Sequence, residues 1–98
     1  MALVIGHKRR EGVKIIGNGL SLDLIIRDFR GPKDKREVLI ELLGLEESKF
    51  LILDTNNFYE ITDNLRVRAS NSSPNSHSVR LCYEAPQEYK IERTYYKF

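Results

Sequence analysis

The chain has 98 residues, of which 41% are hydrophobic and 31% are charged, a balance typical of one globular domain. No segment approaches the ~20 consecutive apolar residues of a membrane span, and the first residues lack the apolar core of a signal peptide. We therefore expect a cytoplasmic protein with no membrane partner. The single cysteine, Cys82, excludes an internal disulfide. Because neither a nucleophile–base pair nor metal-ligand spacing is evident, we expect no enzymatic activity and no cofactor.

The small net charge of +2 hides an uneven distribution along the chain. Residues 1–36 contain nine Lys and Arg against four Asp and Glu, a balance of +5, and residues 64–98 contain six against three, a balance of +3. Residues 37–63 contain one against seven, a balance of −6. If the two basic ends meet in space, they form a surface that attracts phosphate groups.

In the first half of the chain, the pattern predicts short β-strands. Apolar runs at residues 3–5 and 13–16 predict two strands, and Gly17-Asn18-Gly19 predicts a hairpin turn because glycine and asparagine accept positive φ. Residues 20–27 carry a leucine or isoleucine at every second position, which is typical of a strand. Residues 33–43 fit an α-helix or a buried strand, and periodicity leaves both possibilities open.

In the second half, alternate residues share one face at 65–69, 79–83 and 89–93, which predicts three more strands. Residues 71–77 form a polar, turn-rich loop. The order strand, strand, tight turn, strand, polar loop, strand is the same in both halves, with residues 49–54 as a strand shared between them. The chain is therefore predicted to be all-β, with nine or ten strands in a single compact domain.

Two segments resemble the carbon storage regulator (CsrA/RsmA) family. The segment Val79–Arg93, with the sequence VRLCYEAPQEYKIER, resembles the family's V-R-I-G-V-x-A-P strand and the V-x-V-x-R strand that follows it. The segment Leu3–Lys8, with Glu11 and the turn at Gly17, resembles the family's opening L-x-I-[TG]-R-K…G-E…I-G. The resemblance is specific at these two segments and only patterned elsewhere.

The resemblance implies units of five short strands and a C-terminal helix, assembled as an intertwined homodimer with two equivalent RNA sites. Two units in this chain, residues 1–48 and 49–98, resemble such a dimer fused into a single-chain pseudo-dimer. In the family, the first strand of one subunit lies beside the last strand of the other, and the two strands read a GGA element in a single-stranded RNA loop. Family members usually repress translation by covering ribosome-binding sites on mRNA.

Under this resemblance one composite RNA site is preserved. Main-chain groups of the first strand read the bases, while Arg93 and Lys8 hold the RNA backbone. Gly6 lets a base approach the main chain. His7 replaces a family arginine and offers a pH-dependent charge and a ring for base stacking. The predicted RNA-binding residues are Val4, Ile5, Gly6, His7, Lys8, Ala85, Pro86, Glu92 and Arg93.

The second composite site and the C-terminal helix are missing under the same resemblance. Asp54 follows the second unit's opening strand at a position where the family has small or basic residues, and a carboxylate there repels phosphate. The first unit lacks a counterpart of Arg93, and the residues after Arg93 do not follow the family's helix. Arg10 stands where the family has glycine, which predicts a shifted register in the first hairpin.

We therefore expect a monomer that binds one single-stranded or hairpin-loop mRNA element per chain and regulates translation. The alternative is a protein-interaction module without RNA activity, which antagonises or pairs with a regulator of its host. Simpler roles also stay open for the basic residues. Arg93 fits a surface ion pair with Glu92 or Glu88, and residues 8–10 fit a solvated basic turn.

Overall fold

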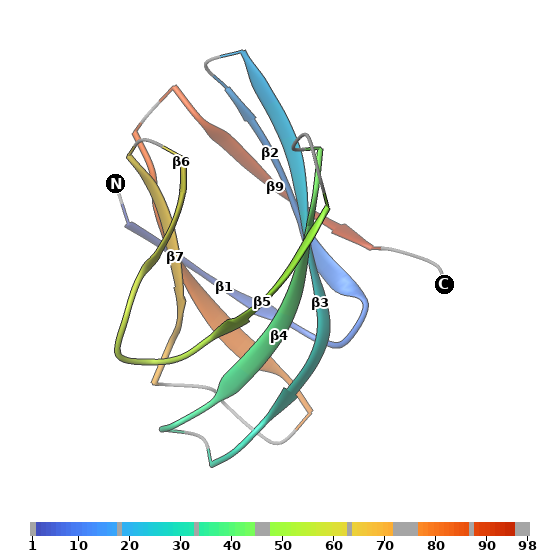
Figure 1. The fold of residues 1–98 in the computed structure, drawn as a ribbon, viewed down its shortest axis with the longest axis vertical. Helices are drawn as coiled ribbons and strands as arrows, with labels where there is room; N and C mark the ends of the chain where they lie inside the picture. Colours follow the sequence, from blue (N-terminus) through green and yellow to red (C-terminus); the bar gives the residue numbers. More distant parts are fainter. Residues whose placement is uncertain are drawn as a thin grey trace.

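The computed structural model describes residues 2–17, 19–32, 34–44, 48–62, 64–71, 77–86 and 88–95. Over these ranges the chain forms nine strands in two antiparallel sheets that face each other (Figure 1). Sheet A consists, in spatial order, of β1 (Ala2–His7), β8 (Val79–Glu84), β7 (Leu65–Ala69) and β6 (Tyr59–Thr62). Sheet B consists, again in spatial order, of β5 (Lys49–Leu53), β4 (Glu37–Leu43), β3 (Leu20–Arg30), β2 (Glu11–Gly17) and β9 (Lys90–Tyr95).

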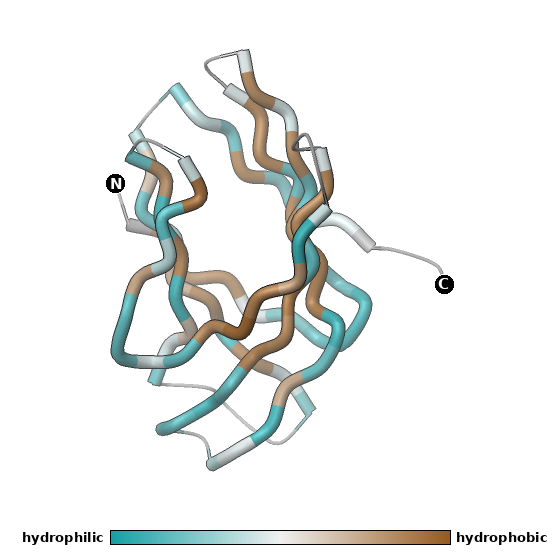
Figure 2. Tube along the Cα trace, in the orientation of Figure 1, coloured by the Kyte–Doolittle hydropathy of each residue, from teal (hydrophilic) through white to brown (hydrophobic). Residues whose placement is uncertain are grey.

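The core lies between the two sheets because each strand turns every second side chain inward. In β8, for example, Val79, Leu81 and Tyr83 are fully buried, whereas the residues between them are partly exposed. In Figure 2, hydrophobic residues recur along the strands, with hydrophilic residues between them and in many of the turns. The described residues contain no helix, so the prediction of an all-β chain is confirmed.

Residues 33–43, for which the sequence left helix and strand open, contain the strand β4. Val38, Ile40 and Leu42 are buried against sheet A, and β4 pairs with β3 on one side and β5 on the other. The shared strand expected at residues 49–54 is β5. Of the predicted hairpin at residues 17–19, Asn18 lies outside the described residues, and so do residues 72–76 of the predicted polar loop.

The two halves of the chain exchange their first strands. Sheet A combines β6, β7 and β8 of the second half with β1 of the first, and sheet B combines β2, β3 and β4 of the first half with β5 of the second. The two sheets follow the same order when each strand of the first half is exchanged with its counterpart four strands later, β1 with β5, β2 with β6, β3 with β7 and β4 with β8. This exchange turns the order β1-β8-β7-β6 of sheet A into β5-β4-β3-β2, which is the order found in sheet B. The registers correspond as well, since Ile5 faces Leu81 in sheet A and Leu51 faces Ile40 in sheet B.

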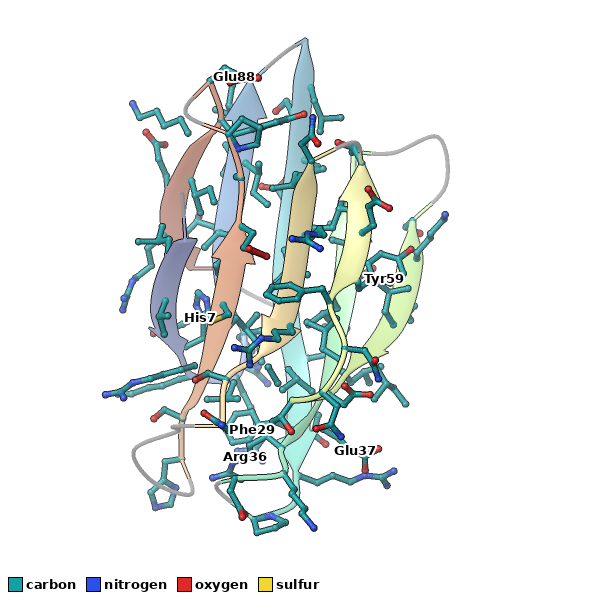
Figure 3. The ribbon with its side chains drawn as sticks, turned by 90° about the vertical axis from the view of Figure 1, so that its left-hand side faces the viewer. His7, Phe29, Arg36, Glu37, Tyr59 and Glu88 are labelled. Atoms are coloured by element: carbon teal, nitrogen blue, oxygen red, sulfur yellow. The ribbon has the colours of Figure 1, made fainter. Side chains whose placement is uncertain are left out.

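One strand breaks this equivalence. Sheet B carries β9 beside β2, whereas among the described residues no strand lies beside β6, the counterpart of β2. The first and last strands therefore form the edges of different sheets: β1 is hydrogen-bonded to β8 in sheet A, and β9 to β2 in sheet B. The first and last strands, which the resemblance places beside each other, are thus not hydrogen-bonded to each other, but both edges lie on the same side of the sandwich (Figure 3).

Candidate nucleic-acid interface

The edge strand β1 leaves part of its main chain free. In an antiparallel ladder both polar groups of one residue point to the same neighbouring strand, and consecutive residues alternate. The amide of Ser70, directly after β7, donates to the carbonyl oxygen of Arg80 at 2.8 Å, so Arg80 faces β7. The main-chain groups of the residues on either side of Arg80, Val79 and Leu81, then face β1, and by register they form their hydrogen bonds with His7 and Ile5. The amides and carbonyls of Val4 and Gly6 consequently point away from the sheet, to the open edge.

The outer face beside this edge is accessible. Val4 is 50% exposed on that face. Gly6 lies opposite Arg80, and the nearest atom to a Cβ built on Gly6 would be Cγ of Arg80, at 3.9 Å. A methyl group on Gly6 would thus lie in ordinary van der Waals contact with Arg80, and the glycine leaves this volume beside the free edge of β1 unfilled.

Arg93 lies at the corresponding edge of the opposite sheet. It is the register partner of Val13, a fully buried residue of β2, so its side chain leaves β9 on the inner face of sheet B. Its charge contributes to lowering the pKa of His7, which places the guanidinium near the inner side of β1. Arg93 is nevertheless exposed and, among the described residues, forms no ion pair. It is thus available to a ligand at the opening between β1 and β9.

His7 does not present its ring to solvent. The residue is 1% exposed, and its Nε2 lies 3.1 Å from the hydroxyl oxygen of Tyr83, a fully buried side chain of β8. Burial, with a smaller contribution from Arg93, lowers the pKa of His7 from 6.5 to about 4. The ring is therefore neutral at physiological pH and points into the core. The expectation that it stacks on a base and carries a pH-dependent charge at the surface is wrong, because β1 turns its odd-numbered residues inward.

Of the remaining predicted residues, Lys8 and Ala85 lie at opposite ends of the β1–β8 pair. Lys8 is exposed directly after β1, whereas Ala85 is buried beyond the other end of the site. Pro86 lines a surface hollow of about 510 Å³. The other lining residues are Glu60, Asn64, Arg66, Glu84 and Ala85. Ile5 packs against the core through its side chain, and its main chain faces Leu81 of β8, so Ile5 offers neither group to the open edge.

Glu92 is not part of this edge. It is the register partner of Lys14 on the outer face of sheet B, and its carboxylate lies 2.8 Å from Nζ of Lys90. Because Arg93 points inward and Glu92 outward, the structure separates two residues that the sequence motif placed in one site. The simpler role, an ion pair of Arg93 with Glu92 or Glu88, is likewise not found among the described residues.

The basic turn between β1 and β2 keeps at Arg10 the backbone conformation that suits the glycine of the family pattern. Arg10 has a φ of 73°, in the left-handed region that glycine adopts without strain, and its amide donates to the carbonyl oxygen of Ile26 at 2.8 Å. Arg9 lies with its guanidinium 4.2 Å from the centre of the Phe29 ring and its Nε 2.8 Å from a carboxylate oxygen of Asp28. Arg9 is therefore structural, whereas the side chains of Lys8 and Arg10 are exposed.

Sequence reasoning recognised that Arg66 and Arg68 face outward but did not assign to the site the group of arginines on the outer face of sheet A. The guanidinium groups of Arg66 and Arg68 lie 4.9 and 5.1 Å from the centre of the Phe58 ring. Arg66 also pairs with Glu84 at 2.7 Å. With Arg80, this face carries three arginines, spaced by the alternation of β7 and β8 that the sequence already showed. The sequence feature that could have identified this group is the arginine at every second position of a strand, because such residues point to the same face of a sheet.

The opposite side of the molecule lacks these features. There β5 takes the place of β1, and the registers make Ile52 the counterpart of Gly6 and Phe50 the counterpart of Val4. Asp54 accordingly stands where the other side has Lys8. With no strand described beside β6, a counterpart of Arg93 is also missing from the described residues.

Comparisons of the chain with protein-family models, with curated proteins and with solved structures gave no match. The described residues contain no group of three or more histidine, cysteine or acidic side chains arranged to hold a metal ion. The same residues include no helix of the length and hydrophobicity that crossing a membrane requires.

Proposed function

We propose that this protein binds single-stranded or hairpin-loop RNA at the opening between β1 and β9 and regulates translation by covering its target. The observation that carries the proposal is the free main-chain edge of β1 at Val4 and Gly6, with the exposed cation of Arg93 on the facing edge. Unpaired amides and carbonyls in a row can read base edges, and a guanidinium can bind phosphate or guanine bidentately. A GGA-type element, implied by the family resemblance, is the sequence we expect this edge to select.

Each part of the edge has a separate role in this proposal. The main chain at Val4 and Gly6 reads the bases, and the missing side chain of Gly6 gives a base room beside Arg80. Lys8 and Arg93, at the end of β1 and across the opening, hold the RNA backbone by charge. His7 acts only through the structure, since its buried bond to Tyr83 fixes β1 against β8.

The exchange of strands between the halves supports a fused pseudo-dimer as the origin of this arrangement. In that scheme β1 comes from one unit and β9 from the other, so the RNA site is composite. The opposite side has no described counterpart of β9 and carries Ile52 and Asp54 instead of Gly6 and Lys8. We therefore expect one RNA per chain.

Binding of a GGA-loop RNA hairpin to Arg93→Ala tests the proposal. Loss of a charge-assisted hydrogen bond costs about 1.5–3 kcal/mol, which is roughly a 10- to 100-fold loss of affinity. The slope of log affinity against log salt should also fall by about 1. Lys49→Ala removes the same charge at the far edge of sheet B and should leave both quantities unchanged. Equal affinity of the wild type and Arg93→Ala across salt concentrations would refute the RNA site.

A second pair of variants tests whether the main chain reads the RNA. Val4→Pro removes an amide hydrogen that takes no part in the ladder, a position where an edge strand tolerates proline. Val4→Ala shortens the same side chain and keeps the amide. We expect Val4→Pro to weaken hairpin binding about tenfold, the value of one lost hydrogen bond, with near wild-type binding by Val4→Ala. Equal binding by the two variants would contradict reading by the main chain at this residue.

A function without RNA is the second candidate, and the side of β5 favours it. Phe50 and Ile52 are 58% and 61% exposed, which is unusual for large apolar residues on an edge strand. If the wild-type chain binds no RNA hairpin at low salt, this candidate, a protein-interaction module, replaces the first.

A further inference from the structure

The free edge of β5 combines unpaired main-chain groups with exposed apolar side chains. Phe50 and Ile52 point to the outer face of sheet B, where Ile52 is the register partner of Leu39. Natural proteins usually protect an edge strand with a charge, a proline or a bulge. The stretch Phe50–Leu53 has none of these and is continuous in its pairing with β4. An edge of this kind is built to accept another strand.

A hollow beside this edge gives an added strand a place for a side chain. It measures about 180 Å³, and its apolar walls come from Leu39, Ile52 and Phe29. Its rim is polar, formed by Asp28, Arg30 and Glu37, and the last two are ion-paired with Arg30 Nε and Glu37 Oε1 3.0 Å apart. Strand addition commonly joins main-chain bonds along an edge to a neighbouring pocket of this type.

We propose that the occupant is the β5 strand of a second copy of this chain, added antiparallel about a two-fold axis at Leu51. Residues opposite each other in such a pair must lie on the same face. A two-fold axis at Leu51 fulfils this condition, because it sets Phe50 of each chain opposite Ile52 of the other on the outer face. The five strands of each sheet B then form one continuous sheet across the two copies.

The charges at the ends of β5 favour this orientation. The strand begins with Lys49 and is followed by Asp54, so antiparallel copies place the basic end of each strand beside the acidic end of the other, with the two charged side chains on opposite faces of the sheet. A parallel pair would place like charges together. Pairing β5 with β1 of another copy would bring Lys8 near Lys49, which is also repulsive. The interface is thus self-complementary, as a closed two-fold contact requires.

Sedimentation of the full chain without RNA tests the proposal independently of RNA binding. Whereas the sequence predicted a monomer, this edge leads us to expect a monomer–dimer equilibrium with a dissociation constant between about 1 µM and 1 mM, the range of small interfaces. Ile52→Lys should raise that constant at least about tenfold, because two lysines would then lie near each other across the axis. Val4→Lys is the matched control, since Val4 is 50% exposed on the equivalent edge strand, and it should leave the equilibrium unchanged.

Amide hydrogen exchange provides the second measurement. On dilution, amides of β5 should lose protection while those of β1 keep theirs, because only the β5 edge is covered in the dimer. A monomer at every concentration would overturn the proposal. Equal effects of Ile52→Lys and Val4→Lys, or assembly beyond a dimer, would also overturn it.

Discussion

Protonation of His7 is expected to destabilise the fold well above the pH at which carboxylates titrate. The imidazole is 1% exposed, and burial is the main cause that lowers its pKa from 6.5 to about 4. An unfolded chain binds the proton near pH 6.5, whereas the folded chain resists it until about pH 4. The free energy of unfolding therefore keeps its full value above the pKa of His7 in the unfolded chain and declines as the pH falls below that pKa. The whole contribution of the neutral imidazole is lost near the pKa of His7 in the folded chain.

The size of the effect follows from the difference in proton affinity. At about 1.4 kcal/mol for each tenfold change, a pKa lowered from 6.5 to about 4 corresponds to a loss of about 3 kcal/mol. A domain of this size is expected to be stable by only about 5–15 kcal/mol, so the loss is a large part of the total. Urea unfolding at a series of pH values between about 7.5 and 4.5 measures it directly.

The control is a double variant, His7→Leu with Tyr83→Phe. It removes the titrating group and the hydroxyl that would otherwise lose its partner, and leucine is also the residue at the equivalent position, Leu53. Removing both partners of a buried hydrogen bond is often close to neutral. The free energy of unfolding of the wild type should therefore fall relative to the variant by about 3 kcal/mol on acidification. A difference that stays constant with pH would refute the burial of a neutral His7.

Three further predictions concern stability and are checked by urea or thermal unfolding. Gly12→Ala should cost about 3 kcal/mol or more, because its Cβ would overlap the carbonyl oxygen of Leu24. Gly6→Ala, whose Cβ would only touch Cγ of Arg80, should change stability by less than about 1 kcal/mol, and similar values for the two variants would contradict the described packing. Arg10→Gly should stabilise the fold by about 0.5 kcal/mol, since relief of the left-handed backbone outweighs the entropy of glycine, and a loss of stability would contradict the φ of 73°. Phe58→Leu should cost about 1–2 kcal/mol by removing two cation–π contacts, and an unchanged midpoint would show that they contribute nothing.

The strands were predictable because their pattern is local. Alternation at residues 65–69 and 79–83 identified β7 and β8, and the similar order of elements identified the equivalence of the halves. Residues 33–43 could not be decided in this way. Leu39 and Leu43 are apolar at positions that face outward in β4, so the alternation typical of a half-buried strand is lost. Pairing with two neighbouring strands, which the sequence does not show, fixes this segment.

The candidate site was only partly predictable. A motif locates Arg93 near the end of a strand, but the direction of each side chain depends on register, which placed Arg93 inward and Glu92 outward. The burial of His7 depends on Tyr83, 76 positions away, and no local pattern reports that contact. The apolar run at β5 is typical of a buried strand, and only its place at a sheet edge leaves Ile52 exposed.

Because both halves belong to one chain, the sequence of each half can change independently of the other. The two edge strands β1 and β5 of this molecule differ in sequence accordingly. In a pair of identical subunits, any substitution in the first strand alters both edges at once. Here one edge has Gly6 and Lys8 at the positions where the other has Ile52 and Asp54. The first combination leaves room and positive charge for a polyanion, whereas the second removes both and adds apolar surface suited to a protein. Under the proposed functions, two equivalent backbone edges would thus serve two kinds of partner, because their main-chain groups are alike and the side chains beside them decide what can approach.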